Sequence, residues 1–166
     1  LVGALQKDSL GRVNLQLEGD GPVRGLFVDA DPDGNVRGYV RAPDAAAPGE
    51  GEAAAREVLG RTGYLSVIRD LGQGRFYRSA VALGGDGLAG VVRRWFAVSE
   101  QVETAFDVCV VPRGDEPLGD VAAFLLQRLP DGDAGAVQAA RQALDAAALA
   151  RALAGGAGAQ EVLAAL

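Results

Sequence analysis

The chain has 166 residues, with 16 basic and 22 acidic side chains that give a formal net charge of −6. It contains no histidine and a single cysteine, which excludes His-dependent nucleophile systems, internal disulfides and zinc sites built from several cysteines. The basic residues form no stripe suited to nucleic acid, and no apolar run is long enough to cross a membrane. We therefore expect one domain over residues 1–166, in the cytoplasm, with neither nucleic acid nor membrane as a partner.

The first half of the chain has the pattern of antiparallel strands joined by tight turns. Val13, Leu15 and Leu17 alternate with polar residues, which is the period of a half-buried strand. Strands are expected at residues 12–18, 23–30, 36–42, 64–70 and 75–83. A mobile loop over 43–52 leads into a short helix that we expect at 52–59.

The second half predicts a helix, a strand pair and a helical end. Residues 88–98 have apolar side chains at helical spacing, which places Trp95 and Phe96 in the core, and Asp86 is positioned to cap the first turn. Strands are then expected at residues 106–111 and 121–129, and helical segments at 134–154 and 159–166.

Together these elements predict an α+β fold, in which antiparallel β-hairpins or sheets pack with helices. The β-rich part is expected over residues 1–130 and the helical end over 134–166. Apolar positions in the strands outnumber those that the helices can cover, so an exposed apolar surface is expected on a face of the sheet.

Two segments contain residue types that occur in binding or redox sites, but a structural role explains each of them better. Residues 29–34 resemble the start of an EF-hand calcium loop, yet Arg37 and Val40 occupy the ninth and twelfth positions, and the flanks are strands. We therefore expect a hairpin turn there. Cys109 lies between two valines of a predicted strand, which favours a small buried hydrophobe over a redox thiol.

The remaining candidates give no catalytic, cofactor-binding or metal-binding residues. The glycine-rich stretches 19–21 and 84–87 fit neither a P-loop nor a dinucleotide fingerprint, so we expect turns. Arg93 and Arg94 are expected to be solvated. Many carboxylate pairs can be drawn and none is preferred, which leaves an acid–base enzyme as an alternative without specific support.

An ordered set of segments resembles the N-terminal domain of the 33 kDa heat-shock chaperonin family, the redox-regulated bacterial holdases. The most specific segment is Trp-Phe-Ala-Val-Ser-Glu-Gln at residues 95–101. The other matching stretches are residues 13–22, 36–41, 63–72 with Tyr77, 121–130 and 159–163.

This resemblance implies a cytoplasmic, dimeric chaperone that binds unfolding proteins without ATP and is not an enzyme. In the family, a C-terminal domain with four cysteines binds zinc and keeps the chaperone inactive until oxidation releases the metal. That domain and the segment before Leu1 are absent from this chain, so we expect no cofactor here and zinc only in the missing domain. Either the chain was cut, or its ends are disordered, or this member lacks the switch.

Two other functions stay open at this point. The chain is either a protein-interaction domain of the same fold that has lost chaperone activity or redox regulation, or an unrecognised enzyme that uses a carboxylate pair. Loss of the inhibitory domain would imply a constitutively exposed binding face for unfolding proteins. The sequence does not identify the residues of that face.

Overall fold

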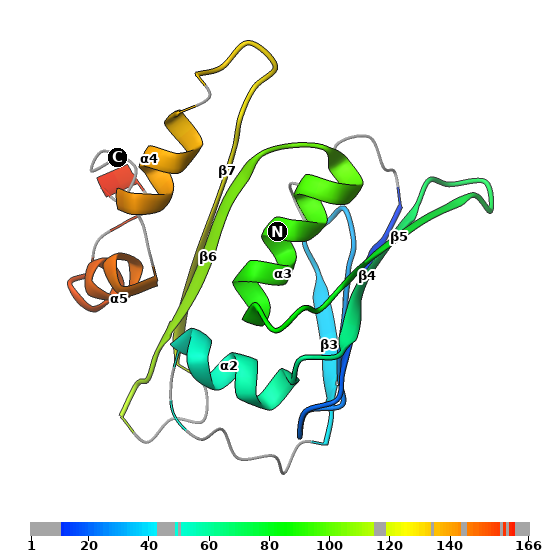
Figure 1. The fold of residues 1–166 in the computed structure, drawn as a ribbon, viewed down its shortest axis with the longest axis horizontal. Coiled ribbons are helices and arrows are strands. Elements are labelled where there is room, and N and C mark those ends of the chain that lie inside the picture. Colours follow the sequence, from blue (N-terminus) through cyan, green and yellow to red (C-terminus); the bar gives the residue numbers. More distant parts are fainter. Residues whose placement is uncertain are drawn as a thin grey trace. The chain divides into compact units, whose positions relative to one another are not determined.

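The computed structural model describes residues 11–42, 49, 51–114, 119–133, 135–143, 146–156, 158 and 160–161. These residues divide into two compact units, Leu1–Gln101 and Val102–Leu166, and each unit has its own sheet (Figure 1). The predicted loop at 43–52 and the predicted helix at 159–166 lie largely outside the described residues. None of the described helices is long and apolar enough to cross a membrane.

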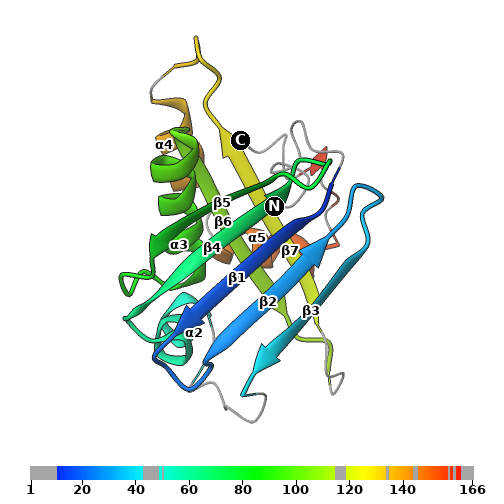
Figure 2. The same cartoon turned by 90° about the vertical axis from the view of Figure 1, so that its right-hand side faces the viewer.

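Five antiparallel strands form the sheet of the first unit, in the order β3-β2-β1-β4-β5 (Figure 2). The strands are β1 Val13–Gly19, β2 Gly25–Ala30, β3 Val36–Arg41, β4 Gly63–Asp70 and β5 Phe76–Ala82. The register places Leu15 of the central strand β1 between Val28 and Val67. All five predicted strands are confirmed, with ends shifted by one or two residues.

Alternation along β1 gives the centre of this sheet a buried inner face, although Ser66 of β4 is also buried and all of β3 is exposed. On the inner face, Val13, Leu15 and Leu17 of β1 are buried together with Leu65 and Val67 of β4. The intervening residues of β1 lie on the outer face and are half-buried. Because side chains alternate with a period of two, the apolar pattern of the sequence fixes which face becomes the core.

The first unit has two helices, one after β3 and one after β5 in the sequence. They are α2 Gly51–Leu59 and α3 Gly87–Trp95, and α3 continues into the π-helix η1 Phe96–Glu100. Trp95 and Phe96 are each 1% exposed, which confirms their predicted place in the core. Trp95 donates from Nε1 to Ser79 Oγ of β5 at 2.9 Å.

The predicted helix over 88–98 is wrong at its C-terminal end. A π-helix spans Phe96–Glu100, and Gln101 after it has the left-handed conformation with φ of 54°. The wider turn changes the angular spacing of the following side chains. Val98, which the regular helical stripe would bury, is therefore 62% exposed.

The start of α3 also differs from the prediction. Asp86 makes no side-chain cap hydrogen bond; its carboxylate forms an ion pair with Arg94. Arg94 also donates to the carbonyl of Ala82 at 2.8 Å, so it is not simply a solvated side chain. The Glu52 carboxylate of α2 lies against Gly87 in the first turn of α3, where a negative charge is favourable.

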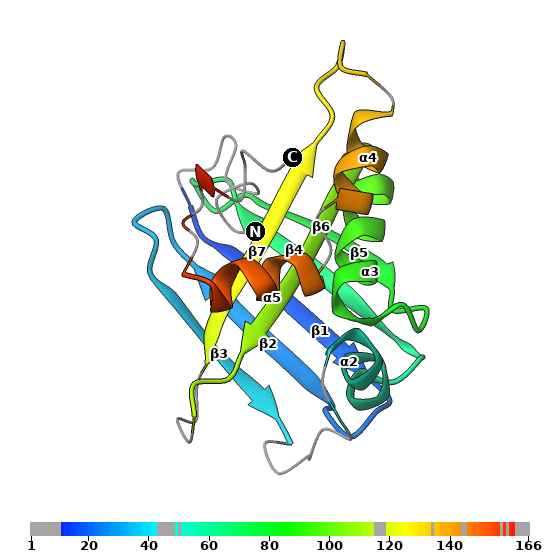
Figure 3. The ribbon, with the colours of Figure 1, turned by 90° about the vertical axis from the view of Figure 1, so that its left-hand side faces the viewer.

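The second unit is a β-hairpin with two helices. Its elements are β6 Thr104–Val111, β7 Asp120–Gln127, α4 Ala136–Ala143 and α5 Ala146–Ala154. The helical sequence predicted over 134–154 thus forms two helices, and α5 lies against the hairpin (Figure 3). The hairpin belongs to the same unit as the helical end.

Cys109 forms a small core with Leu149 of α5, and Phe124 and Leu153 pack against it. The thiol is 9% exposed, as predicted for a small buried hydrophobe. We expect it to react with a thiol reagent at least about 100-fold more slowly in the folded chain than in denaturant. Absorbance of the released thiolate during a disulfide-exchange assay measures both rates, and equal rates would contradict this burial.

Candidate functional site

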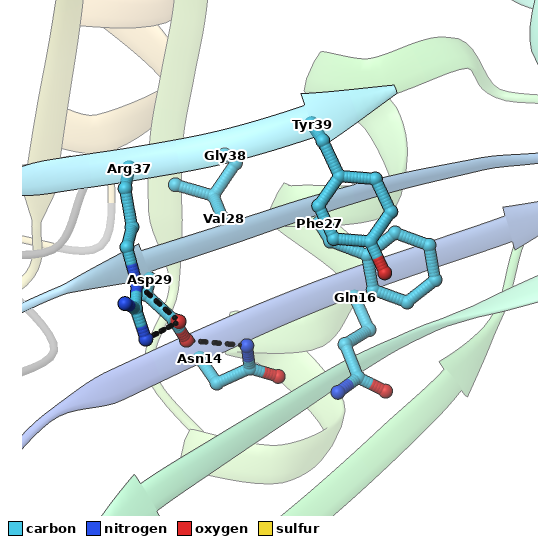
Figure 4. A pocket seen from close by; sticks show the side chains of 8 residues that line it. All are labelled: Asn14, Gln16, Phe27, Val28, Asp29, Arg37, Gly38 and Tyr39. Carbon is cyan, nitrogen blue, oxygen red and sulfur yellow. Dashed lines mark hydrogen bonds and ion pairs between the residues drawn. The ribbon is translucent and has the colours of Figure 1, made fainter. Parts of the chain in front are cut away.

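The outer face of the first-unit sheet holds a groove of about 420 Å³ over β1, β2 and β3 (Figure 4). It is lined by Asn14, Gln16, Phe27, Val28, Asp29, Arg37, Gly38 and Tyr39. Strand register accounts for six of these residues, because residues that are directly paired across neighbouring strands lie on the same face, whereas Val28 and Gly38 pair with each other in the inner-face row. One row joins Asn14, Asp29 and Arg37, and the next joins Gln16, Phe27 and Tyr39.

The first row is a polar network centred on a carboxylate. Asn14 Nδ2 donates to Asp29 Oδ1 at 2.6 Å, and Arg37 donates from Nε to Asp29 Oδ2 at 3.1 Å. The hydrogen bond from Asn14, followed by the contact with Arg37, lowers the pKa of Asp29. The Asp29 carboxylate of β2 is therefore ionised, and it links β2 to Asn14 of β1 and to Arg37 of β3.

The second row is an aromatic shelf beside this network. The rings of Phe27 and Tyr39 stack with centroids 4.7 Å apart and planes 12° apart. The Arg41 guanidinium lies 5.2 Å from the centre of the Phe27 ring, in cation–π geometry. Tyr39 is 61% exposed, so this shelf presents both an apolar surface and positive charge to solvent.

The lowered pKa of Asp29 gives a pH-dependent prediction. A carboxyl whose pKa falls below its usual 3.8 on folding stabilises the fold above that value, and the contribution is lost as the pH falls through the folded pKa. We expect Asp29→Asn to lower the free energy of unfolding by about 1 kcal/mol at pH 7.

The difference between wild type and Asp29→Asn should vanish below the folded pKa of Asp29. Urea unfolding followed by circular dichroism over a pH series measures it. A difference that persists unchanged in acid would show that the carboxylate charge is not the cause.

A second group of side chains joins two of the stretches that carry the family resemblance, 63–72 with Tyr77 and 95–101. Arg69 of β4 forms an ion pair with Glu100 at the end of η1. Its guanidinium lies 5.2 Å from the ring centre of Tyr77 and 5.8 Å from that of Trp95. A pocket of about 270 Å³ is lined here by Arg69, Leu71, Tyr77, Ser99 and Glu100. The sequence alone did not predict this cluster. The only signal was that Arg69, Tyr77, Trp95 and Glu100 belong to the segments that resemble the chaperonin family.

The sequence profile of the Hsp33 protein family matches residues 1–165 of the chain. The chain belongs to the Hsp33 family. The 33 kDa chaperonin of Cyanothece sp. (strain PCC 7425 / ATCC 29141) is 40% identical over 134 residues, which cover 78% of this chain and 44% of that relative. The 33 kDa chaperonin of Synechococcus sp. (strain JA-3-3Ab) is 42% identical over 107 residues, covering 63% and 33% respectively.

A solved structure agrees with this assignment to the Hsp33 family. The crystal structure of the 33 kDa chaperonin from Thermotoga maritima matches with a TM-score of 0.62 and 30% sequence identity, over 75% of this chain and 44% of that one. The predicted family resemblance and the predicted α+β fold are therefore confirmed. The chain spans less than half the length of each of these relatives.

Exposed apolar side chains of this Hsp33-family chain gather at the two edges of the first-unit sheet. Val36, Tyr39 and Val40 lie on the edge strand β3, and Leu71, Phe76 and Tyr77 lie in and beside the turn between β4 and β5. Each of them is at least 40% exposed. The other exposed large apolar residues are Val98 of η1 and, in the second unit, Val110, Val121 and Leu129, so exposed apolar surface is not confined to a sheet face.

The calcium-like loop is a hairpin turn, as predicted. Asp31 Oδ1 accepts hydrogen bonds from the backbone N–H groups of Asp33 and Asn35 at 3.1 and 2.9 Å. Both Asp29 and Asp31 have a lowered pKa, so this pair lacks the partner of raised pKa that a general acid requires.

The residues described also provide no ligand set for the zinc that the family resemblance implies. No group of three or more His, Cys, Asp or Glu side chains in the described residues can hold a metal ion. The single thiol, Cys109, is enclosed by apolar side chains. The part of the chain that the structure describes therefore does not fit a zinc site.

Proposed function

We propose that this chain is the protein-binding core of an ATP-independent holdase, which takes up unfolding proteins on exposed apolar surface. The observation that carries this proposal is the set of large apolar side chains left exposed at both edges of the first-unit sheet in a member of the Hsp33 family. Monomeric soluble proteins rarely expose large contiguous apolar patches without an interaction to serve. A homodimer and a cytoplasmic location belong to the same proposal.

Apolar burial supplies the driving force for such binding. Removing apolar surface from water contributes about 25 cal/mol per Å², before the entropy cost of association is subtracted. The most exposed large apolar residues among the described part of the first unit are Phe76 at 66%, Val36 at 65% and Val98 at 62%. The net charge of −6 opposes self-association of a surface of this kind.

Redox control of the whole protein is part of the proposal and is assigned to cysteines outside these residues. Cys109 is the only thiol of the chain, and its burial beneath α5 separates it from oxidants in solvent. On this basis the chain alone is active under reducing conditions.

Light scattering from a heat-denaturing client protein tests the proposal. The purified chain is added at a near-equimolar ratio, without ATP and with reductant, and a folded protein of similar size and charge serves as the control. We expect the chain to suppress aggregation and the control to leave it unchanged. Unchanged aggregation, with the chain shown to be folded by circular dichroism, would overturn the proposal and favour an interaction domain without chaperone activity.

A further inference from the structure

Strand β3 lies at one edge of the first-unit sheet, and no described strand pairs with its free side. It pairs with β2 along one side, and it is the terminal strand in the order β3-β2-β1-β4-β5. All six of its residues, Val36–Arg41, are exposed. Alternate backbone N–H and C=O groups of an edge strand point away from the sheet. Among the described residues, no backbone hydrogen bond outside the β2–β3 ladder uses a group of β3.

Of the features that normally block an exposed edge, β3 has only charged side chains, those of Arg37 and Arg41. The strand contains no proline and no lysine, and its pairing with β2 runs residue by residue without a bulge. The opposite edge of the sheet differs, because Arg94 from α3 donates to the carbonyl of Ala82 at the end of β5. The edge of β3 is therefore the better template for an added strand.

The two faces of β3 have different chemistry. Val36, Gly38 and Val40 alternate on the inner face, so an incoming strand meets an apolar row there. Arg37, Tyr39 and Arg41 alternate on the outer face, where an incoming strand meets two cations on either side of an aromatic ring (Figure 4 shows Arg37 and Tyr39).

Charge selects the kind of segment that fits this edge. β3 has two arginines and no acidic residue in a chain whose net charge is −6. Arg37 is paired with Asp29, whereas Arg41 lies over the Phe27 ring and has no ion pair among the described residues. An acidic side chain opposite Arg41 gains a cross-strand charge pair.

We propose that an extended segment of an unfolding client, with alternating apolar and acidic residues, adds to the sheet as a sixth strand beside β3. Its backbone pairs with the free edge, its apolar side chains cover Val36 and Val40, and its acidic side chains face Arg37 and Arg41. This inference rests on the proposed holdase function and specifies how a client is recognised. Strand addition of this kind gives affinity through the main chain and selectivity through alternate side chains.

A second copy of the chain fits this edge less well than an acidic segment does. In a two-fold antiparallel pairing centred on Tyr39, Arg37 of one copy would lie opposite Arg41 of the other. Like charges directly opposite each other destabilise a strand pair. A client segment with acidic residues replaces that repulsion with attraction.

A peptide-binding experiment tests strand addition. The probe is a fluorescent eight-residue peptide of alternating valine and glutamate, whose binding to the full chain is measured by anisotropy. A second peptide has N-methyl groups on alternate backbone nitrogens, which removes N–H donors while keeping the side chains. We expect N-methylation on the edge-facing nitrogens to weaken binding at least about tenfold. Equal binding of both peptides, in either alternate N-methyl pattern, would overturn strand addition.

Charge reversal on β3 tests whether the peptide binds beside this strand. Arg41→Glu on β3 should weaken binding of the glutamate peptide about tenfold and strengthen binding of a valine–lysine peptide. Arg75→Glu, in the β4–β5 turn, is the matched control and should leave both affinities within about twofold. Equal effects of the two variants would place the peptide elsewhere, or show a general charge effect, and would overturn the inference.

The same variants separate this inference from the holdase proposal. If the wild-type chain suppresses client aggregation but Arg41→Glu and N-methylation change no affinity, the inference fails and the holdase proposal stands. If the chain suppresses no aggregation, the holdase proposal fails whatever the peptides do. If sedimentation shows that Arg41→Glu alters a dimer and that the peptide competes with dimer formation, a second copy occupies the edge and the inference is overturned.

Discussion

Trp95→Ala is expected to lower the free energy of unfolding of the first unit by about 3–5 kcal/mol, the usual range for removing a large aromatic side chain from a core. Trp95 is 1% exposed and contacts the Phe96 ring edge-on, with centroids 5.0 Å apart. The Arg69 guanidinium lies over its ring, and Ser79 accepts its N–H. The substitution therefore leaves a cavity and removes the hydrogen-bond partner of Ser79.

Trp95→Phe is the matched control for this prediction. It keeps an aromatic ring in the core but loses the N–H that donates to Ser79, so the expected loss is about 1–2 kcal/mol. Urea unfolding followed by far-ultraviolet circular dichroism measures both variants, since tryptophan fluorescence is lost in each. If Trp95→Ala lowers the free energy of unfolding no more than Trp95→Phe does, the ring does not stabilise the fold by packing.

Removing the Glu100 carboxylate is expected to have the second largest effect. Glu100→Ala leaves the Arg69 guanidinium enclosed by Tyr77 and Trp95 without its counter-charge. The side chains of Arg69 and Glu100 are 18% and 24% exposed. We therefore expect the free energy of unfolding to fall by about 2–3 kcal/mol. This is no more than the loss that follows when one partner of a fully buried ion pair is removed.

A double-mutant cycle tests whether the penalty comes from the uncompensated charge. Replacement of both partners, as Arg69→Met with Glu100→Leu, should be less costly than Glu100→Ala alone, because no buried charge is then left unpaired. Thermal and urea unfolding of Glu100→Leu, Arg69→Met and the double variant close the cycle, and Glu100→Ala is measured beside them. Additive losses would show that Arg69 and Glu100 act independently.

Much of the fold was predictable because the relevant signals are local. The alternation at Val13, Leu15 and Leu17 defines a strand and its buried face within five residues. The turn at Asp31 to Asn35 closes through hydrogen bonds from backbone N–H groups two and four residues away. Cys109 is buried, as its apolar neighbours in the strand predict for a small hydrophobe.

The family was also predictable, but the cluster that its motifs form was not. Arg69 and Glu100 are 31 residues apart, and their ion pair depends on where η1 meets the sheet. The π-helix at Phe96 and the pairing of Asp86 with Arg94 are likewise absent from any helical periodicity. These contacts are set by tertiary packing, which overrides the regular continuation of a helix.

Composition and short-range periodicity by themselves determined the class of fold and the strands of the first unit, and the motif resemblance indicated the family. Only the tertiary structure decided the strand order, which leaves β3 at an edge, and the exposure of Val36 and Tyr39 there. The physical reason is that burial and pairing depend on which distant segments become neighbours. A strand with the same alternation is protected in the centre of a sheet and open to a partner at its edge.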